Sequence, residues 1–297
     1  MTNKKHGIIA IVGAPNAGKS TLTNALVEQK ITIVSPKVQT TRTSIKAIFN
    51  YQENQIILID TPGIFIPKKD KALERYIAKG AWQALRESNH ICFVIDAVAG
   101  LNNQNRQILA DLKKENLPTT IIINKIDLIK KSKLLEILAE FVQEGFEDII
   151  PVNATQNLEE NKNGIKDLKI FLAQKCQNDD WIYEEDQVTD APIKFLAEEI
   201  TREKLFLKLN QELPYSLHVS TDSFQNFDNG DIKIQQTILV SKDNHKNIVI
   251  GKRGSLLKEI GIEARNEISQ LCQTNVHLFL FVKVKEDWMK SELKSQP

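Results

Sequence analysis

The sequence predicts an α/β domain, with a mostly parallel sheet and helices on both faces, followed by a smaller α+β domain. Three observations lead to this prediction. The chain has 297 residues, which is long for a single compact domain. Up to about residue 176, short runs rich in Ile and Val alternate with amphipathic stretches, as buried strands and covering helices do. Beyond residue 190 this alternation stops and a different order of elements begins.

The first domain is predicted to span residues 1–177. Its expected strands are Ile8–Val12, Gln55–Ile59, Ile91–Ile95, Thr119–Ile123 and Ile149–Val152. Its expected helices are Lys19–Glu28, Lys71–Arg86, Gln104–Lys114, Lys133–Glu144 and Ile165–Cys176. Strands with almost no polar interruption, each followed by a helix, indicate a parallel sheet covered on both sides.

The second domain is predicted to span residues 191–297, after an acidic linker at residues 178–190. The linker holds six acidic residues and no Lys or Arg, which favours an exposed segment over an acidic first turn of the next helix. A long helix is expected from Pro192 to about Leu213, and a second helical region ends at Cys272. The expected strands are Tyr215–Ser223, Ile232–Ser241, a short apolar strand Asn247–Ile250, and Val276–Val284.

Composition and charge indicate a soluble protein of the cell interior. The chain is 41% hydrophobic and 26% charged, and its net charge of +1 means that any basic surface is local. Cys92, Cys176 and Cys272 are far apart, which argues against a metal site or a disulfide framework and favours a reduced compartment. No apolar run approaches the roughly 20 residues of a membrane span. We therefore expect a cytoplasmic protein, with loose peripheral membrane contact left open.

A phosphate-binding loop is predicted between the first strand and the first helix. Residues 13–20 read Gly, four residues, then Gly-Lys-Ser, and the glycines allow backbone N–H groups to face a β-phosphate. Lys19 would bridge the β- and γ-phosphates and Ser20 would bind Mg²⁺. A purely structural loop is the alternative, which the strand and helix around it disfavour. The expected nucleotide contacts here are Gly13, Ala14, Pro15, Asn16, Ala17, Gly18, Lys19, Ser20 and Thr21.

A second group of residues is predicted to hold Mg²⁺ and to sense the γ-phosphate. Asp60-Thr61-Pro62-Gly63 follows a buried strand, so Asp60 would hold Mg²⁺ through water and the Gly63 N–H would face the γ-phosphate. This motif alone indicates only a turn, but forty residues after Ser20 it is informative. Within Gln39–Thr43, Thr41 is favoured over Thr40 as the residue that completes Mg²⁺ coordination.

The base-binding loop is predicted at Asn124-Lys125-Ile126-Asp127. The Asp127 carboxylate would accept hydrogen bonds from guanine N1–H and the 2-amino group, whereas adenine would leave it facing an acceptor. This chemistry favours GTP and GDP over ATP; the alternative role for Asp127 is a helix N-cap. Lys125 would pack over the base and Asn124 would brace the loop. After the last strand, Asn153-Ala154 would offer the Ala154 N–H to guanine O6.

The order of these motifs resembles the translation-factor-related GTPases, and the sequences Gly-x-Pro-Asn-x-Gly-Lys-Ser, Gln-Thr-Thr-Arg and Asp-Thr-Pro-Gly resemble the Era family of bacterial ribosome-assembly GTPases. The resemblance continues through Glu199-Ile-x-Arg-Glu-Lys204, Glu212-Leu-Pro-Tyr215, Ile248–Gly254, Ile260–Arg265, Val282-Lys-Val-Lys285 and Trp288. It implies a P-loop GTPase domain followed by a type-2 KH domain. It also implies a monomeric GTPase switch that binds single-stranded 16S rRNA near its 3′ end and assists 30S subunit assembly and rRNA maturation. The alternatives are a passive RNA-binding scaffold and a membrane-proximal signalling GTPase that acts on proteins.

The resemblance also implies a set of catalytic residues, namely Asn16, Lys19, Thr41 and Gly63. Ile64 stands where many small GTPases carry a Gln that positions water, so hydrolysis needs another source of help. Asn16 matches the position at which relatives hold K⁺ near the β- and γ-phosphates, and stabilisation of the loop by its amide is the alternative. A further departure is Asn153 in place of the family's Ser, with the next Gly only at 164.

A candidate RNA interface surrounds Gly251-Lys252-Arg253-Gly254, which matches the Gly-x-x-Gly loop of KH domains. Such loops clamp about four nucleotides. Between residues 242 and 258 there are five basic residues and one acidic residue, enough to attract phosphates locally, while a plain solvated turn is the alternative. Ile248, Val249 and Ile250 would form one wall of the groove. The predicted RNA contacts are Ile248, Ile250, Gly251, Lys252, Arg253, Gly254 and Lys258.

Overall fold

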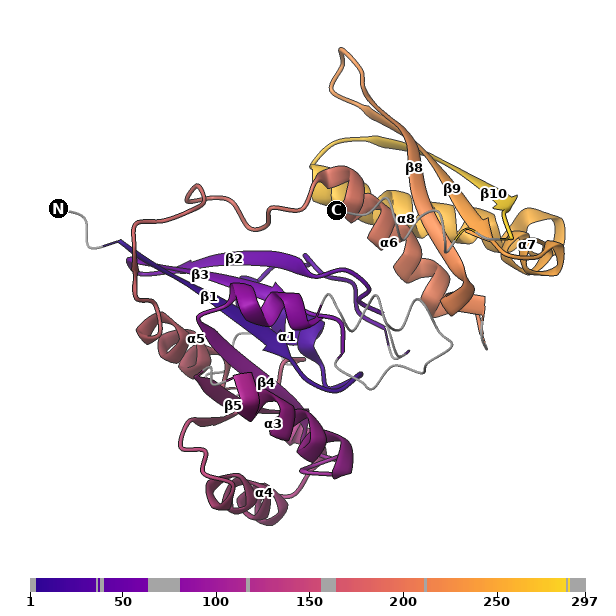
Figure 1. Ribbon diagram of the computed structural model, residues 1–297. Coiled ribbons are helices and arrows are strands. Elements are labelled where there is room, and N and C mark those ends of the chain that lie inside the picture. Colours follow the sequence, from indigo (N-terminus) through magenta and orange to yellow (C-terminus); the bar gives the residue numbers. More distant parts are fainter. Residues whose placement is uncertain are drawn as a thin grey trace. The chain divides into compact units, whose positions relative to one another are not determined.

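The computed structural model in Figure 1 describes residues 4–35, 37, 40–63, 81–115, 118–155, 164–210, 213–286 and 288. The chain forms two compact units. The first comprises Met1–Thr32 and Thr41–Asp190, and the second comprises Ile33–Thr40 and Ala191–Pro297. The fold class predicted from the sequence, a P-loop domain followed by a smaller α+β domain, is confirmed.

The first unit is built on one sheet with the strand order β2-β3-β1-β4-β5-β6, in which β7 pairs with β1. The strands are β1 (Lys5–Val12), β2 (Ile45–Tyr51), β3 (Asn54–Asp60), β4 (His90–Asp96), β5 (Thr119–Asn124), β6 (Ile149–Pro151) and β7 (Asn178–Asp179). Only β2 and β7 run antiparallel to their neighbours. The five strands that the sequence predicts are therefore present, whereas β2 was not predicted.

Helices cover both faces of this sheet, as Figure 1 shows. They are α1 (Lys19–Val27), α3 (Asn103–Glu115), α4 (Lys131–Gln143) and α5 (Ile165–Gln174). Val12, Phe93 and Ile123 pack with α3 and α4 in one core, whereas α1 and α5 contact each other and β2 and β3. Residues 81–87 are helical, and the rest of the predicted helix Lys71–Arg86 lies outside the described residues. Because every parallel strand ends at the same edge, the loops after β1, β3, β4 and β5 lie together there.

The segment predicted as an exposed linker is fastened to the first unit. After β7, the amide oxygen of Gln55 accepts hydrogen bonds from the N–H groups of Ile182 and Tyr183, both at 2.9 Å. Further along, Ile48 N–H donates to the Val188 carbonyl at 2.8 Å, along the free edge of β2. These backbone hydrogen bonds were not predicted from the sequence, and they form because the unpaired edge of β2 and the buried Gln55 amide supply partners. The acidic side chains at 184–186 and 190 are nevertheless exposed.

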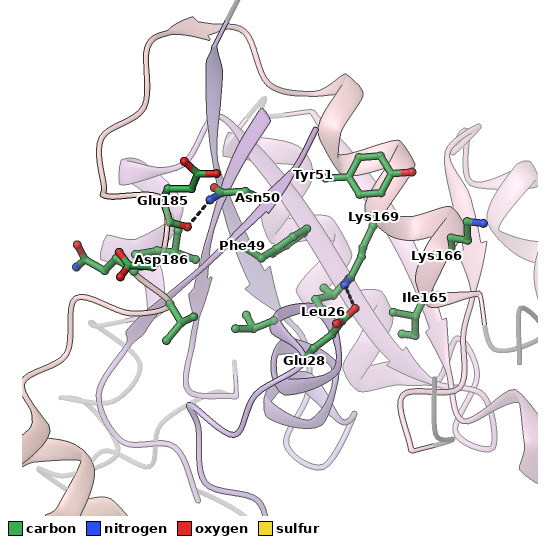
Figure 2. Close-up of a pocket in the computed structure, with 14 residues that line it drawn as sticks. Leu26, Glu28, Phe49, Asn50, Tyr51, Ile165, Lys166, Lys169, Glu185 and Asp186 are labelled. Atoms are coloured by element: carbon green, nitrogen blue, oxygen red, sulfur yellow. Dashed lines mark hydrogen bonds and ion pairs between the residues drawn. The ribbon is translucent and has the colours of Figure 1, made fainter. Parts of the chain in front are cut away.

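A pocket of about 650 Å³ lies beside this fastened segment, between β2, α1 and α5 (Figure 2). Lys169 forms an ion pair with Glu28 at 2.5 Å, and the Asn50 amide donates to the Glu185 carbonyl at 2.8 Å. None of the lining residues belongs to the predicted nucleotide-binding motifs. The pocket is therefore separate from the candidate nucleotide site.

The second unit contains a three-stranded sheet and three helices within the described residues. Its elements are α6 (Ile193–Lys208), β8 (Leu217–Asn226), β9 (Ile232–Val240), α7 (Asp243–Ile250), α8 (Ser255–Cys272) and β10 (Val276–Val284). The strand order is β10-β9-β8, with β10 parallel and β8 antiparallel to β9. Ile234, Ile238 and Ile260 are fully buried in the cores that join the sheet to α6 and α8.

The predicted strand Asn247–Ile250 is instead the end of a helix, α7. The run Ile248-Val249-Ile250 favours a strand when it is considered alone. In the structure only Val249 is buried in the core, and Ile248 exposes 47% of its surface. Because the core takes up only one of these three apolar residues, a helix of 8 residues places Val249 inward, and Asp243 lies favourably in its first turn.

Candidate functional site

The loop between β1 and α1 has the backbone that a phosphate site requires. Gly13 and Gly18 have φ angles of 153° and 90°. A Cβ atom on Gly13 would lie 2.2 Å from the Val94 carbonyl oxygen, and one on Gly18 would lie 2.2 Å from the Asn124 amide nitrogen. Asn16 is also left-handed, with φ 63°. The N–H groups in the first turn of α1 have no hydrogen-bond partner within the helix, and the helix dipole makes this end positive. Both features favour the binding of a phosphate.

Lys19 is held inside this loop. Its ammonium donates to the carbonyls of Gly13 at 3.2 Å and Ala14 at 3.0 Å, and only 7% of the residue is exposed. Burial lowers the pKa of Lys19 to about 8, and the nearby charge of Asp60 raises it in part. A buried ammonium fixed by two carbonyls is positioned to receive further oxygen acceptors, such as phosphates.

Three oxygen-bearing side chains meet at the start of α1. Ser20 Oγ donates to Asp60 Oδ2 at 2.8 Å and lies 2.9 Å from Thr41 Oγ1. Thr40 Oγ1 instead contacts Ser35 Oγ at 2.7 Å. Asp60 is fully buried, and within the described residues its Oδ1 has no hydrogen-bond partner. An all-oxygen set with an unsatisfied carboxylate oxygen fits Mg²⁺, which takes few protein ligands when phosphates supply the rest.

Burial also gives Asp60 a testable effect on stability. Desolvation raises the pKa of Asp60 to about 6, against the lowering effects of the Ser20 hydrogen bond and of Lys19. Because the folded pKa lies above the unfolded value of 3.8, the folded protein binds more protons between these pH values. Without nucleotide or Mg²⁺, the unfolding free energy of the wild type should fall relative to that of Asp60→Asn as pH rises from 4 to 6, by about 2 kcal/mol. Urea unfolding of both proteins measures this difference, and parallel pH curves would contradict it.

Gly63 lies close to the phosphate loop. A Cβ atom on Gly63 would come within 2.9 Å of the Pro15 nitrogen, so only glycine fits this approach. Thr61 is bound to β1, since its hydroxyl donates to the Ile11 carbonyl at 2.7 Å. The structure therefore places the Asp60–Gly63 turn against the phosphate loop. The predicted contact between the Gly63 N–H and a γ-phosphate requires this closeness. Ile64, which stands in the place of a water-positioning Gln, lies outside the described residues.

Asn124 joins three loops at the end of β5. Its amide donates to the Ala17 carbonyl at 3.0 Å, and its oxygen accepts from the N–H groups of Lys125 at 2.8 Å and Ala154 at 3.2 Å. Asn124 is buried, with 2% exposed. It therefore fixes the phosphate loop to the predicted base loop. The Ala154 N–H, predicted to reach guanine O6, is engaged here by Asn124 at a long distance, and the guanine contact stays a prediction.

Asp96 is a site residue that the sequence analysis missed. Its carboxylate forms a 2.7 Å ion pair with the Lys125 ammonium, which also donates to the Asn16 carbonyl at 2.8 Å. The other carboxylate oxygen accepts from Val98 N–H at 2.8 Å. Asp96 thus fixes the ammonium of Lys125, whose stem is predicted to pack over the base. Its position at the end of β4, beside two motif-bearing strands, was the available signal.

Asp127 and Asn153 differ in how the structure holds them. Asp127 lies in the 3₁₀ turn Ile126–Leu128 and is exposed, and it caps neither this turn nor α4. The alternative of an N-cap is therefore not what the structure has. Asn153 is buried and accepts from Thr155 N–H at 3.1 Å, so it shapes its own loop. Residues 156–163, where the loop departs from the family pattern, lie outside the described residues.

The chain between α1 and β2 begins with a group of hydrogen bonds around Asn24 and Thr32 that was not predicted from the sequence. The Asn24 amide oxygen accepts from the N–H groups of Ile31 and Thr32, both at 2.9 Å. Thr32 Oγ1 donates to the Ser20 carbonyl at 3.1 Å. The following stretch Ile33–Thr40 belongs to the second unit, where Val34 N–H donates to the Glu203 carboxylate at 2.8 Å. The predicted switch segment thus starts from a fixed point on α1.

The Gly-x-x-Gly loop lies between α7 and α8 rather than after a strand. Gly251, Arg253 and Gly254 all have positive φ angles, of 74°, 53° and 78°. A Cβ atom on Gly251 would meet Leu256 Cβ at 2.7 Å, whereas Gly254 has open space around it. Lys252 and Arg253 are exposed at the tip. The loop therefore presents two cations on a backbone that another chain can approach closely.

A groove of about 470 Å³ begins at this loop and lies between α8 and β10. Lys258, a predicted contact, lines it together with Gly254 and Leu257. None of the three residues of the predicted wall lines this groove, because Val249 is buried in the core and neither Ile248 nor Ile250 is among the lining residues. The groove is also lined by four residues that were not predicted from the sequence, namely Ile262, Arg265, Phe279 and Phe281. Their strand and helix periodicity was the signal that placed them opposite the core.

Comparisons with known proteins agree with this division of the chain. The family described as 50S ribosome-binding GTPase matches residues 8–125, and the KH domain family matches residues 212–289. The GTPase Era of Afipia carboxidovorans is 44% identical over 284 residues, which cover 95% of this chain and 90% of that protein. The GTPase Era of Ehrlichia canis is 41% identical, covering 96% and 95%. The chain belongs to the Era family of GTPases.

Solved structures of Era extend the match to the whole fold. One is Era in complex with MgGDPNP and nucleotides 1506–1542 of 16S ribosomal RNA, and another is an Aquifex aeolicus Era variant bound to GDP and AlF4⁻. Each has a TM-score of 0.90 and 36% identity, covering 96% of this chain and 95% of that chain. As a member of the Era family, the chain is a GTP hydrolase that forms GDP and phosphate. No helix among the described residues is long and apolar enough to cross a membrane.

Proposed function

We propose that the protein is a GTP-controlled RNA-binding factor that binds single-stranded 16S rRNA near its 3′ end and assists 30S subunit assembly and rRNA maturation. The observation that carries this proposal is the loop tip at Lys252 and Arg253. Both side chains are exposed there, and the backbone around them is left-handed. The same chain carries the phosphate-binding and base-binding motifs of a GTPase. The relative solved with MgGDPNP and a 16S rRNA segment covers nearly the whole chain. This match supports the same pairing of ligands here.

In this proposal, Mg²⁺ is bound with the nucleotide by Ser20, Thr41 and, through water, Asp60. The bound ion would neutralise charge that develops on the phosphates. Lys19 would contact the β- and γ-phosphates, and Gly63 would donate its N–H to the γ-phosphate. Asp127, braced through Asn124 and Lys125, would select guanine. Loss of the γ-phosphate would release Thr41 and Gly63, which is how GTPase switches change state.

Asn16 is proposed to bind K⁺ beside the β- and γ-phosphates. It lies at the exposed tip of the phosphate loop, in a left-handed conformation that Asn tolerates, and its carbonyl is fixed by Lys125. A monovalent cation there would supply positive charge during hydrolysis, in the manner of an arginine finger. GTP turnover measured in K⁺ and in Na⁺, with and without RNA, tests this role. Equal rates in both salts would exclude it.

The RNA-binding role is tested by reversing the charge of the loop tip. Lys252→Asp with Arg253→Asp should weaken binding of an oligonucleotide from the 16S rRNA 3′ end by about 100-fold or more, since two phosphate contacts become repulsive. The full-length protein with Mg²⁺ and GDPNP is titrated into labelled RNA and followed by fluorescence anisotropy. Rates of GTP hydrolysis with and without RNA are measured in parallel.

The matched control reverses two exposed lysines of the first unit, Lys130 and Lys131, to Asp. This control changes the total charge equally and should leave RNA affinity within about threefold of the wild type. Equal weakening by both pairs would show that only net charge matters. Unchanged binding of the loop variant would refute the proposed RNA interface.

A further inference from the structure

The outward face of β10 carries two exposed phenylalanines. Burial alternates along this strand, so that Leu278, Leu280 and Val282 turn toward the helices while the residues between them turn outward. Phe279 and Phe281 are two of the outward residues, and each exposes 47% of its surface. Being two positions apart on one strand, they stand side by side on the same face.

The surroundings of these two rings are polar and carry both lysines and carboxylates: Thr237 donates to Asp222 at 2.6 Å, and His277 contacts Asp231 at 3.1 Å. Across the parallel pairing with β9, Phe279 lies opposite Gln235 and Phe281 lies opposite Thr237. The ammonium of Lys233 lies 5.7 Å from the centre of the Phe279 ring, and Lys283 is exposed on the same face. Exposed aromatic rings among lysines are the composition of surfaces on which nucleic-acid bases stack.

This face is continuous with the Gly-x-x-Gly groove. Gly254, Lys258 and Arg265 line the groove from α8, and residues 278–281 line it from β10. Because β10 is an edge strand of the sheet, no other strand of the described unit separates the groove from the two rings. A strand of RNA that leaves the loop along this groove therefore passes Phe279 and Phe281, which line it on the β10 side.

We propose that Phe279 and Phe281 form a stacking platform for two bases of single-stranded RNA, adjoining the nucleotides held by the Gly-x-x-Gly loop. This inference rests on the proposed RNA-binding function and extends its footprint. Sheet-borne aromatic side chains bind bases in this way in other RNA-binding folds, where every base offers a face to stack. The loop clamps about four nucleotides, so the platform lengthens the bound segment to about six.

Length-dependent binding tests the platform. The full-length protein with Mg²⁺ and GDPNP is measured against single-stranded RNAs of about four and about eight nucleotides from the same 16S rRNA region. The wild type should bind the longer RNA more tightly. Phe279→Ala and Phe281→Ala should each weaken binding of the longer RNA by about 5- to 100-fold and leave the shorter one unchanged.

Two further variants separate stacking from other effects. Replacement of both residues by Tyr should keep wild-type binding, whereas replacement of both by Leu should lose it although an apolar surface remains. Leu207→Ala is the control, because Leu207 on α6 also exposes 47% of its surface. Photo-crosslinking of 5-bromouridine RNA, followed by peptide mapping, should yield adducts on β10.

Several outcomes would overturn the platform. Equal loss on both RNA lengths would show that the two rings contact the nucleotides held by the loop and form no platform beyond them. Full binding by the Leu variant would replace stacking with plain apolar contact. If the wild type binds both RNA lengths with equal affinity, the proposed RNA-binding function stands, but the platform is refuted. Binding of neither RNA by the wild type would refute the proposed function itself.

Discussion

Asp127→Asn is expected to exchange a preference for guanine nucleotides for a preference for xanthine nucleotides. In the proposed site, the carboxylate would accept two hydrogen bonds, from guanine N1–H and the 2-amino group. An Asn amide in its place turns a donor toward that amine, whereas xanthine has a carbonyl oxygen there. Leaving two buried polar groups mismatched should weaken GDP and GTP binding by about 1000-fold, and xanthine nucleotides should gain correspondingly.

The structure explains why this substitution acts on the base alone. Asp127 is exposed in its 3₁₀ turn and caps no helix, so its replacement should leave the fold unchanged. Lys125, with φ 63°, and Asn124 set the position of that turn through bonds to the phosphate loop. Competition between labelled GDP and unlabelled GDP or XDP measures both affinities.

Asp167→Asn is the matched control, since Asp167 is exposed on α5 in the same unit. It should bind both nucleotides as the wild type does. Retention of guanine preference by Asp127→Asn would show that another group reads the base.

Lys19→Met is expected to weaken the binding of GDP and GTP strongly without destabilising the nucleotide-free protein. Two charge-assisted hydrogen bonds to phosphates would be lost, which corresponds to a decrease in affinity of about 100-fold or more. The stability effect has the opposite sign. Burial lowers the folded pKa of Lys19 to about 8, from 10.5, so the charged form costs folding free energy below pH 8. That cost fades as pH rises from 8 to 10.5, and Met removes it at every pH.

Thermal unfolding with and without Mg²⁺ and GDP measures both effects together. For the wild type, nucleotide at 100 times its Kd should stabilise the folded state by about 2.7 kcal/mol, whereas Lys19→Met should show no such shift at the same concentration. Without nucleotide, the melting temperature of the variant should equal or exceed that of the wild type. Lys166→Met, which removes an exposed lysine of α5, should retain the nucleotide-induced shift. A variant that melts earlier without nucleotide would show that Lys19 stabilises the empty loop.

The sequence was sufficient for the parts whose chemistry is local. Gly13 and Gly18 adopt backbone angles that only their residue type accepts readily, so a short motif determines the loop. Buried parallel strands are continuous apolar runs, and all five predicted ones are present. β2 was missed because it ends in the polar residues Asn50 and Tyr51 and lies at the sheet edge, where the apolar signal is weaker.

Two segments differ from the sequence-based expectation because tertiary contacts, rather than local composition, determine their structure. The run Ile248–Ile250 has strand composition, but the core takes up only Val249 and a helix results. The acidic segment after residue 177 has linker composition, yet its backbone satisfies the edge of β2 and the amide of Gln55. The first outcome depends on which side chains the core can bury, and the second on which backbone groups still need hydrogen-bond partners.

The sequence by itself thus determined the two domains, the phosphate and base loops, and membership of the Era family. Those features depend on residues adjacent in the chain. Only the tertiary structure decided that Asp96 holds Lys125, that Thr41 rather than Thr40 reaches Ser20, and that two phenylalanines of β10 line the groove beside the Gly-x-x-Gly loop. Each of these contacts joins elements distant in sequence, and strand register and helix packing, which no single segment encodes, place them together.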